Sequence, residues 1–207
     1  EITNIYGYEE VRTPEFEHTE VFSRENDSSD VVNKEMYTFL DKGERSLTLK
    51  PEGTAGLIRW FNQNKMFNGP DAPFKYYYLT PAFRYERPQK GRMRIHHQFG
   101  LEVLGDKSAY IDAEIIGLGI TFLRTLGLNN LKVLINTLGD QESRMAYQNA
   151  LKAHFEKDIQ ELCPDCQRRY VQNPLRILDC KVDVEHTSLK TAPKLSDYLN
   201  EESKKYF

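Results

Sequence analysis

Residues 81–102 read PAFRYERPQKGRMRIHHQFGLE, and this stretch decides the fold that we predict for the chain. Side chains alternate between two faces along a β-strand, so the stretch is read with a period of two. The first arm places Arg84 and Glu86 on one face, and the turn formers at 88–91 let the chain reverse. The return arm places on one face Arg92, Arg94, His96, Gln98, Gly100 and Glu102. The pattern predicts a β-hairpin.

The two faces of this hairpin indicate different surroundings. The back of the return arm is largely apolar and carries Ile95, His97, Phe99, Leu101 and Val103. The front carries guanidinium, amide and carboxylate groups, which suit an anionic ligand that forms hydrogen bonds. The alternative is a solvent-exposed face whose ion pairs contribute little, because surface ion pairs are common and weak.

The composition is ordinary for a soluble globular protein and limits the possible functions. The 207 residues can form one core and part of another, and a net charge of −3 argues against sequence-blind nucleic-acid binding, although contact through a local patch stays open. No apolar run is as long as a membrane span, and the first residues do not resemble a signal peptide. Three cysteines, an odd number, fit a reducing compartment. We therefore expect a cytoplasmic protein without membrane contact.

Upstream of the hairpin, turn residues and apolar spacing mark several short elements. We expect a short strand within 6–15 that ends at Pro14, one or two helical turns in 16–22, and a mobile loop in 23–31. The further expected elements are strands at 36–40, 46–49 and 75–79 and a helix that begins at Thr54.

Downstream of the hairpin the pattern becomes helical. Residues 108–126 carry an apolar stripe of helical spacing, with Ser108 as the N-cap and Gly127 just past the end. The further expectations are a buried strand at 131–135, a helix that Asp140 caps and that buries Tyr147, Leu151 and Phe155, and a last helix opened by Pro193. Strands with hairpin-length connections favour an α+β fold, with a mixed, mostly antiparallel sheet flanked by helices.

Several motifs add a resemblance to a known family. The hairpin sequence FRYERPQKGR, followed by HHQFGLE, resembles motif 2 of the class II aminoacyl-tRNA synthetases, in the form found in histidine–tRNA ligases. Residues 6–17 (YGYEEVRTPEFE) resemble motif 1, and residues 49–56 (LKPEGTAG) resemble the turn that binds the amino acid. Later segments resemble the same family in the same order: NTLGDQESR, CPDCQRRYVQNPLRILDCK and APKLSDYLNEESKKYF. The resemblance implies a partial class II catalytic domain over residues 1–207, without motif 3 and without the insertion and anticodon-binding domains.

The activity that this resemblance implies is the ATP-dependent ligation of histidine to its tRNA through histidyl-adenylate. It also implies Mg²⁺ with the ATP, contact with the acceptor end of tRNA, and a homodimer formed through motif 1 around Pro14. Because the distal motifs are absent, we expect the chain alone to be incomplete for catalysis and inactive. The alternative function is that of the regulatory paralogue of ATP phosphoribosyltransferase, a non-catalytic subunit that senses histidine.

The same resemblance implies the residues of the site. Arg84 is the catalytic residue, because a guanidinium can bridge the histidine carboxylate and the α-phosphate of ATP. The histidine-binding residues are Glu52, Gly53, Thr54, Arg84, Gln98 and Glu102. The ATP-binding residues are Arg84, Glu86, Arg92 and His96. Taken alone, Glu52 is equally well interpreted as a negative charge at a helix N-terminus.

Two positions depart from the family pattern. His96 stands where an aromatic residue usually stacks on adenine, and an imidazole stacks more weakly. Lys50 replaces a common arginine, which keeps the charge and loses the planar fork of donors.

Three cysteines allow a different interpretation. Cys163 and Cys166 have the CxxC spacing of metal ligands, Cys180 follows, and His186 is near in sequence. A closed structural zinc site needs four ligands, and nothing in the sequence supports His186 as the fourth. The family that the chain resembles does not use this segment for metal. We expect no metal site, and a small zinc-binding module remains the lesser alternative.

Overall fold

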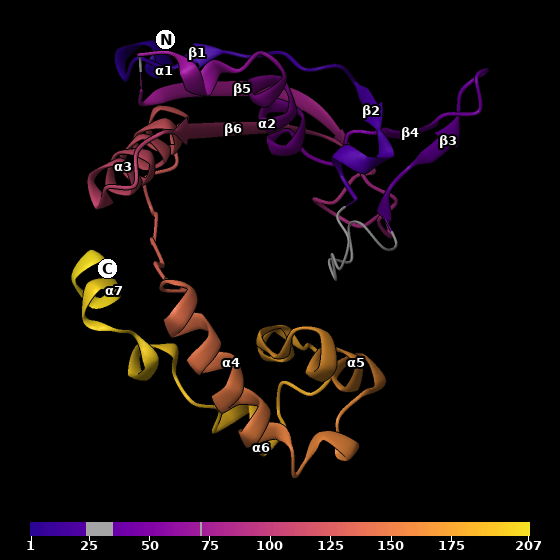
Figure 1. Ribbon diagram of the computed structural model, residues 1–207, viewed down its shortest axis with the longest axis vertical. Coiled ribbons are helices and arrows are strands. Elements are labelled where there is room, and N and C mark those ends of the chain that lie inside the picture. Colours follow the sequence, from indigo (N-terminus) through magenta and orange to yellow (C-terminus); the bar gives the residue numbers. More distant parts are fainter. Residues whose placement is uncertain (24–34, 71) are drawn as a thin grey trace. The chain divides into compact units, whose positions relative to one another are not determined.

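The computed structural model describes residues 1–23, 35–70 and 72–207, which form two compact units (Figure 1). The first unit spans Glu1–Leu131 and the second spans Lys132–Phe207. The expectation of one partial catalytic domain over residues 1–207 stays a prediction. The loop predicted at 23–31 lies outside the described residues, apart from Ser23.

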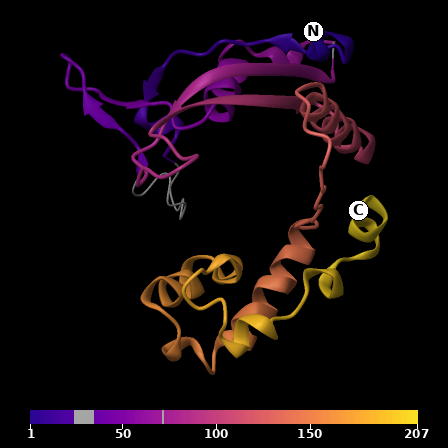
Figure 2. The ribbon, with the colours of Figure 1, turned by 180° about the vertical axis from the view of Figure 1, so that it is seen from behind.

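The first unit is built on the predicted hairpin. Strands β5 (Phe74–Phe83) and β6 (Ile95–Leu104) pair antiparallel along their whole length, and Figure 2 shows them side by side. Strand β1 (Glu9–Glu10) pairs with β5 in parallel, so the sheet has the order β1-β5-β6. The predicted mixed, mostly antiparallel sheet is confirmed.

The hairpin differs from the prediction in length. Residues 75–79 are not a separate strand, because β5 continues through Thr80 and Pro81. The connection is also longer than the predicted turn at 88–91: it covers residues 84–94, and within it Gln89 and Arg92 form an isolated bridge. The predicted strand in 6–15 is reduced to the two residues of β1, well before Pro14.

A second sheet has the order β2-β4-β3 and is antiparallel. Its strands are β2 (Phe16–His18), β3 (Thr38–Leu40) and β4 (Ser46–Leu49). A turn joins β3 to β4, and the Asp41 carboxylate accepts the backbone N–H of Gly43 and of Arg45. The helical turns predicted at 16–22 are half wrong: β2 pairs with β4, and the 3-10 helix η1 (Thr19–Val21) follows it.

Helices cover both faces of the first sheet. The helices of this unit are α1 (Ile2–Ile5), α2 (Thr54–Gln63), the 3-10 helix η3 (Met66–Asn68) and α3 (Ala109–Thr125). Helix α2 buries Leu57 and Phe61 against Phe74 and Tyr76 of β5. On the other face the Phe122 ring of α3 stacks on Phe99, with ring centroids 4.6 Å apart. The front of the hairpin therefore holds the core at one end as well as the predicted polar groups.

The second unit contains no strand among its residues and is helical. Its α-helices are α4 (Gln141–Phe155), α5 (Pro164–Gln172), α6 (Thr187–Lys190) and α7 (Glu201–Tyr206). Its 3-10 helices are η4 (Ile159–Glu161), η5 (Pro174–Asp179) and η6 (Leu195–Tyr198). The predicted stripe of α4 is confirmed, since Tyr147, Leu151 and Phe155 are buried in one core. Asp140 caps α4 by accepting the Ser143 N–H at 2.8 Å.

Two predictions for this region are wrong. Residues 131–135 are not a buried strand: Val133, Leu134 and Ile135 are exposed, and no described strand pairs with them. A strand needs a neighbour for its backbone groups, and apolar composition alone does not supply one. Pro193 does not open a single helix, because η6 ends at Tyr198 and α7 begins anew with Asn200 as its cap. No helix of the part that the structure describes combines the length and apolar character needed to cross a bilayer.

Candidate functional site

The site is centred on the turn Pro-Glu-Gly-Thr at residues 51–54, between the end of β4 and the start of α2. The Glu52 carboxylate accepts the N–H of Thr54 at 2.5 Å and that of Ala55 at 2.8 Å. These are first-turn donors that have no partner within the helix. Glu52 thus has the helix-terminal role that the sequence also allowed, and it fixes the shape of the turn.

Two residues of β6 bind this turn from the hairpin. The N–H of Gly53 donates to Gln98 Oε1 at 3.0 Å, and the hydroxyl of Thr54 donates to Glu102 Oε1 at 2.7 Å. Gln98 and Glu102 are four residues apart in one strand, so they share a face, as the period of two predicts. The structure therefore brings together the five residues of the turn and of β6 that were predicted to bind histidine.

Tyr78 belongs to the same group and was not predicted. Its hydroxyl lies 3.2 Å from Thr54 Oγ1 and 3.5 Å from Glu102 Oε1. A Cβ added at Gly53 would lie 2.3 Å from the Tyr78 ring, and one added at Gly100 would lie 2.1 Å from it. Both positions therefore need glycine. Gly100 lies directly opposite Tyr78 in the hairpin register, and a glycine in mid-strand was the signal that a large side chain crosses there.

The charges at this site are poorly compensated. Burial raises the pKa of Glu102, and the nearby Glu52 charge acts in the same direction, against the hydrogen bond from Thr54. Burial also raises the pKa of Tyr78 to about 12. A half-buried carboxylate whose charge is disfavoured gains most from a ligand that brings N–H donors or a positive charge. This group of side chains suits an ammonium or an imidazole group.

Three of the four predicted ATP-binding residues lie in the connection between β5 and β6, and the fourth, His96, lies in β6. Arg84 Nε donates to the carbonyl oxygen of Pro51 at 2.8 Å, which ties this connection to the turn. Arg84 Nη1 lies 3.9 Å from Glu86 Oε1, and Arg92 Nη1 lies 3.5 Å from Glu86 Oε2. His96 pairs with Ala82 and is two residues before Gln98, so it shares the front face. The structure thus groups Arg84, Glu86 and Arg92 beside the turn.

Lys50 has a structural role. Its side chain is 2% exposed, and its Nζ lies 3.3 Å from both Glu15 Oε2 and the Thr13 carbonyl oxygen. The ammonium therefore links the segment before β2 to the chain between β4 and the turn at 51–54. A single donor group suffices for these two contacts, so the departure from arginine is accommodated.

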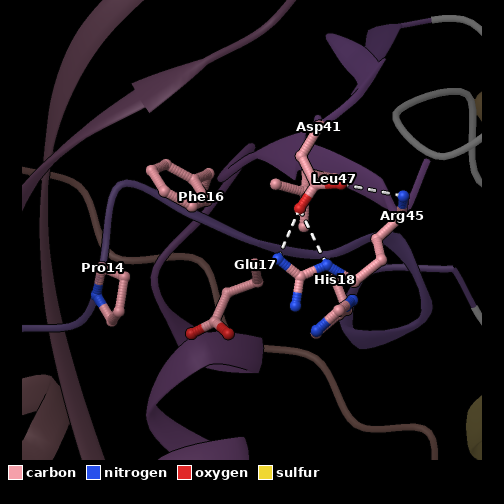
Figure 3. Close-up of a pocket in the computed structure, with 7 residues that line it drawn as sticks. All are labelled: Pro14, Phe16, Glu17, His18, Asp41, Arg45 and Leu47. Atoms are coloured by element: carbon pink, nitrogen blue, oxygen red, sulfur yellow. Dashed lines mark hydrogen bonds and ion pairs between the residues drawn. The ribbon is translucent and has the colours of Figure 1, made fainter. Parts of the chain in front are cut away.

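Pro14 does not belong to this group of residues. It lines a separate open pocket of about 530 Å³ whose other side chains come from β2, β4 and the turn before β4 (Figure 3). The other residues that line it are Phe16, Glu17, His18, Asp41, Arg45 and Leu47. Apolar residues of β2 and β3 are partly open to solvent: Phe16 is 50%, Phe39 43% and Leu40 66% exposed.

Comparisons with known proteins agree with this arrangement. The family model "Histidyl-tRNA synthetase" matches residues 1–192. The histidine–tRNA ligase of Bacillus licheniformis is 59% identical over the whole chain, and that of Bacillus subtilis is 56% identical over 98% of it. The chain spans about half the length of the curated relatives it matches, 49% and 48% for these two.

Solved structures are also similar to the chain. The apo histidyl-tRNA synthetase of S. aureus is 42% identical, with a TM-score of 0.78, and the match covers the whole chain and 45% of that protein. An ATP phosphoribosyltransferase regulatory subunit/histidyl-tRNA synthetase from Bacillus halodurans matches at 21% identity and a TM-score of 0.59, over 99% of this chain and 54% of that one. That second likeness shows the fold alone. The predicted α+β fold of the class II synthetases is confirmed.

Proposed function

The chain belongs to the histidyl-tRNA synthetase family, and on this premise we propose that it carries the histidine and ATP sites of a histidine–tRNA ligase. In the first step a carboxylate oxygen of histidine attacks the α-phosphorus of ATP, and pyrophosphate leaves. In the second step the terminal ribose hydroxyl of tRNA attacks the carbonyl carbon of histidyl-adenylate, and AMP leaves. Because the chain spans about half of its relatives, both steps are proposed for a protein that contains it.

The observation that carries this proposal is the hydrogen-bonded connection between the turn and the hairpin. Gln98 and Glu102 hold Gly53 and Thr54, and Arg84 holds Pro51, so one rigid frame carries all of them. Bringing two anions together for reaction requires such a frame, because a small misplacement costs much of the rate.

The histidine contacts follow from the chemistry of the turn. Glu52 has lone pairs beyond the two that α2 uses, and we assign them to the substrate ammonium, next to Gly53 and Thr54. Gln98 can donate through its amide nitrogen to the substrate carboxylate, while its oxygen stays on Gly53. Glu102 only accepts hydrogen bonds, so it suits an imidazole N–H. An analogue without that N–H would leave Glu102 with only the hydroxyls of Thr54 and Tyr78 as partners.

The ATP contacts are assigned to the connection between the strands. Arg84 would contact the α-phosphate and stabilise the charge that builds on it, with its Nε already fixed on Pro51. Glu86 and Arg92 would hold the rest of the nucleotide, and His96 would stack on adenine. Mg²⁺ would come with the phosphates, since this ion takes most of its ligands from phosphate and water, and Glu86 is the carboxylate beside Arg84 that fits it.

The proposal also covers the partners and the cellular location of the protein. The acceptor end of tRNA must reach the adenylate. A homodimer through the surface around Pro14 is supported by the exposed side chains of Phe16, Phe39 and Leu40, because such apolar side chains gain from a second copy. A cytoplasmic location is consistent with the three free cysteines.

The regulatory paralogue is the weaker alternative. The structure described with that name shares the fold at 21% identity, whereas two curated histidine–tRNA ligases are 59% and 55% identical over the whole chain. The turn at 51–54 and the hairpin residues named above favour an enzyme over a subunit that only senses histidine.

Histidine-dependent exchange of pyrophosphate into ATP tests the function. The chain would replace the matching part of the Bacillus subtilis relative, which is 56% identical to it. The hybrid protein should catalyse the exchange, and Arg84→Ala should slow it by about two to three orders of magnitude. Arg84→Lys should also be slow, because it loses the planar fork. The 207-residue chain alone should show no exchange.

Arg124→Ala is the matched control, since Arg124 is an exposed arginine of the same unit, in the last turn of α3. It should leave the exchange rate unchanged. A folded hybrid that binds histidine without any exchange would favour the sensor, and an Arg84→Ala hybrid as fast as the parent would remove Arg84 from the reaction.

A further inference from the structure

The second unit holds a cluster of side chains that the proposed function does not use. The sulfur atoms of Cys163, Cys166 and Cys180 and a carboxylate oxygen of Asp183 all lie within 4.8 Å of one another. Cys163 immediately precedes α5, Cys166 is in its first turn, and Cys180 follows η5. The chain has three cysteines in all, so every thiol of the chain meets here.

The spacing of these atoms fits a single tetrahedral ion. Ligand sulfurs at about 2.3 Å from zinc are about 3.8 Å apart along the edge of a tetrahedron. Cys163 Sγ and Cys180 Sγ are 3.7 Å apart. Cys180 Sγ and Asp183 Oδ2 are 3.4 Å apart, which allows for the shorter bond from zinc to oxygen.

The fourth donor is Asp183 and not His186, the histidine that is near the cysteines in sequence. Asp183 Oδ2 accepts the Cys163 N–H at 3.0 Å, which places the carboxylate over the start of α5. His186 faces elsewhere: its Nδ1 lies 2.6 Å from Ser188 Oγ, and its Nε2 lies 3.5 Å from Glu161. Three thiols and one carboxylate make the four donors of a closed site.

The cluster lies at the core of the second unit. Cys166 is fully buried and Cys180 is 5% exposed, both within the core that contains Leu162 and Ile177. A metal bound here would therefore be held mostly away from solvent.

We propose that Cys163, Cys166, Cys180 and Asp183 bind one Zn²⁺ ion, which joins α5 to the segment after η5 and stabilises the second unit. Soft thiolates select zinc over magnesium or calcium. Each thiol that becomes a ligand releases its proton to solvent, so up to three protons leave as the ion binds. A unit of this size with many short helices gains from such a link, as small domains commonly do.

Metal content and cobalt spectroscopy test the site on the 207-residue chain, purified under reducing conditions with zinc in the growth medium. About one zinc per chain is expected. After chelation, added Co²⁺ should give a thiolate charge-transfer band and the intense visible bands of tetrahedral cobalt. Zinc should also raise the thermal midpoint of the chelated protein.

Variants identify the ligands. Cys180→Ser should weaken zinc binding at least tenfold in competition with a chromophoric chelator, and Asp183→Asn should weaken it while the cobalt bands that report thiolates remain. His186→Gln is the matched control and should bind like the parent. If Cys180→Ser does not fold, the Asp183→Asn and His186→Gln pair decides the ligand set.

Three results would overturn the proposal. The first is metal far below one equivalent with three thiols that react freely after mild denaturation. The second is a Cys163–Cys180 disulfide in the protein as isolated. The third is loss of zinc from His186→Gln together with full retention in Asp183→Asn.

Discussion

The polar groups of the two units are held in different ways. In the first unit they sit on two long paired strands and on a turn, and regular spacing decides which side chains meet: Gln98 and Glu102 share a face because they are four residues apart in β6. In the second unit Cys163, Cys180 and Asp183 sit at helix ends and in the turns between them. In a regular element the spacing along the sequence predicts which face each side chain occupies, whereas in an irregular segment it does not.

The same difference applies to stability. The core of the first unit is formed between a sheet and helices, with Tyr78 fixed between two glycines. The core of the second unit is formed by the stripe of α4 and by short helices packed on it. The chain has one tryptophan, Trp60, whose ring packs edge-on against Tyr76 in the first unit, with centroids 5.3 Å apart. Its fluorescence therefore reports the first unit, whereas helical circular dichroism reports both units, because their α-helices are of similar total length.

The largest effect is expected for Phe155→Ala in the second unit. Phe155 is fully buried, and removing such a ring leaves a cavity that costs about 3–5 kcal/mol in the free energy of unfolding. In urea a part of the circular dichroism change should move to much lower concentration and separate from the Trp60 transition, which stays in place. Val171→Ala, at a site that is 74% exposed on α5, should move neither. A joint shift of both transitions would show that the two units unfold as one.

A smaller loss is expected for Gly100→Ala in the first unit. The added Cβ meets the Tyr78 ring at 2.1 Å, and overpacking of this kind costs about 1–3 kcal/mol. The Trp60 transition should shift, and the part of the circular dichroism change that reports the second unit should not. Gly117→Ala in α3 is the control, since its added Cβ meets nothing within 4 Å and alanine favours a helix by up to about 1 kcal/mol. Equal transitions for the two variants would argue against the tight packing of Tyr78.

The smallest effect on stability is expected for Glu102→Gln. The pKa of Glu102 is raised in the folded state, chiefly by burial, so protonation favours folding. The stability that this group contributes is full below its ordinary pKa of 4.5 and is lost as the pH rises through the raised value. The neutral variant escapes this loss. At pH 7 the variant should be as stable as the parent or slightly more so, and this difference in stability should disappear as the pH falls. Urea midpoints measured between pH 7 and pH 4 test this expectation. A difference that grows as the pH falls would contradict the assignment.

Counting along the sequence predicts what lies on regular elements. The hairpin, the front-face positions of Gln98 and Glu102, and the buried stripe of α4 follow from periods of 2 and 3.6. Tyr78 was missed because its role depends on what crosses from the partner strand, where Gly100 leaves room.

Other features could not be derived by counting. Residues 131–135 have the composition of a buried strand, but a strand also needs a partner, and no described strand supplies one. Asp183 could not be chosen over His186 as a partner of the cysteines, because both follow Cys180 in an irregular segment and only its turns decide which side chain faces the sulfurs.

The central claim is that the turn at 51–54 and the face of β6 together bind histidine, and calorimetric titration tests it most directly. Histidine and ATP would be titrated separately into the hybrid with the Bacillus subtilis relative and into its Glu102→Gln variant. Loss of a charged hydrogen-bond acceptor should weaken histidine binding about tenfold to a hundredfold. ATP binding should be unchanged, because the nucleotide is assigned to Arg84, Glu86 and Arg92. Equal histidine affinity in the two proteins would contradict the claim.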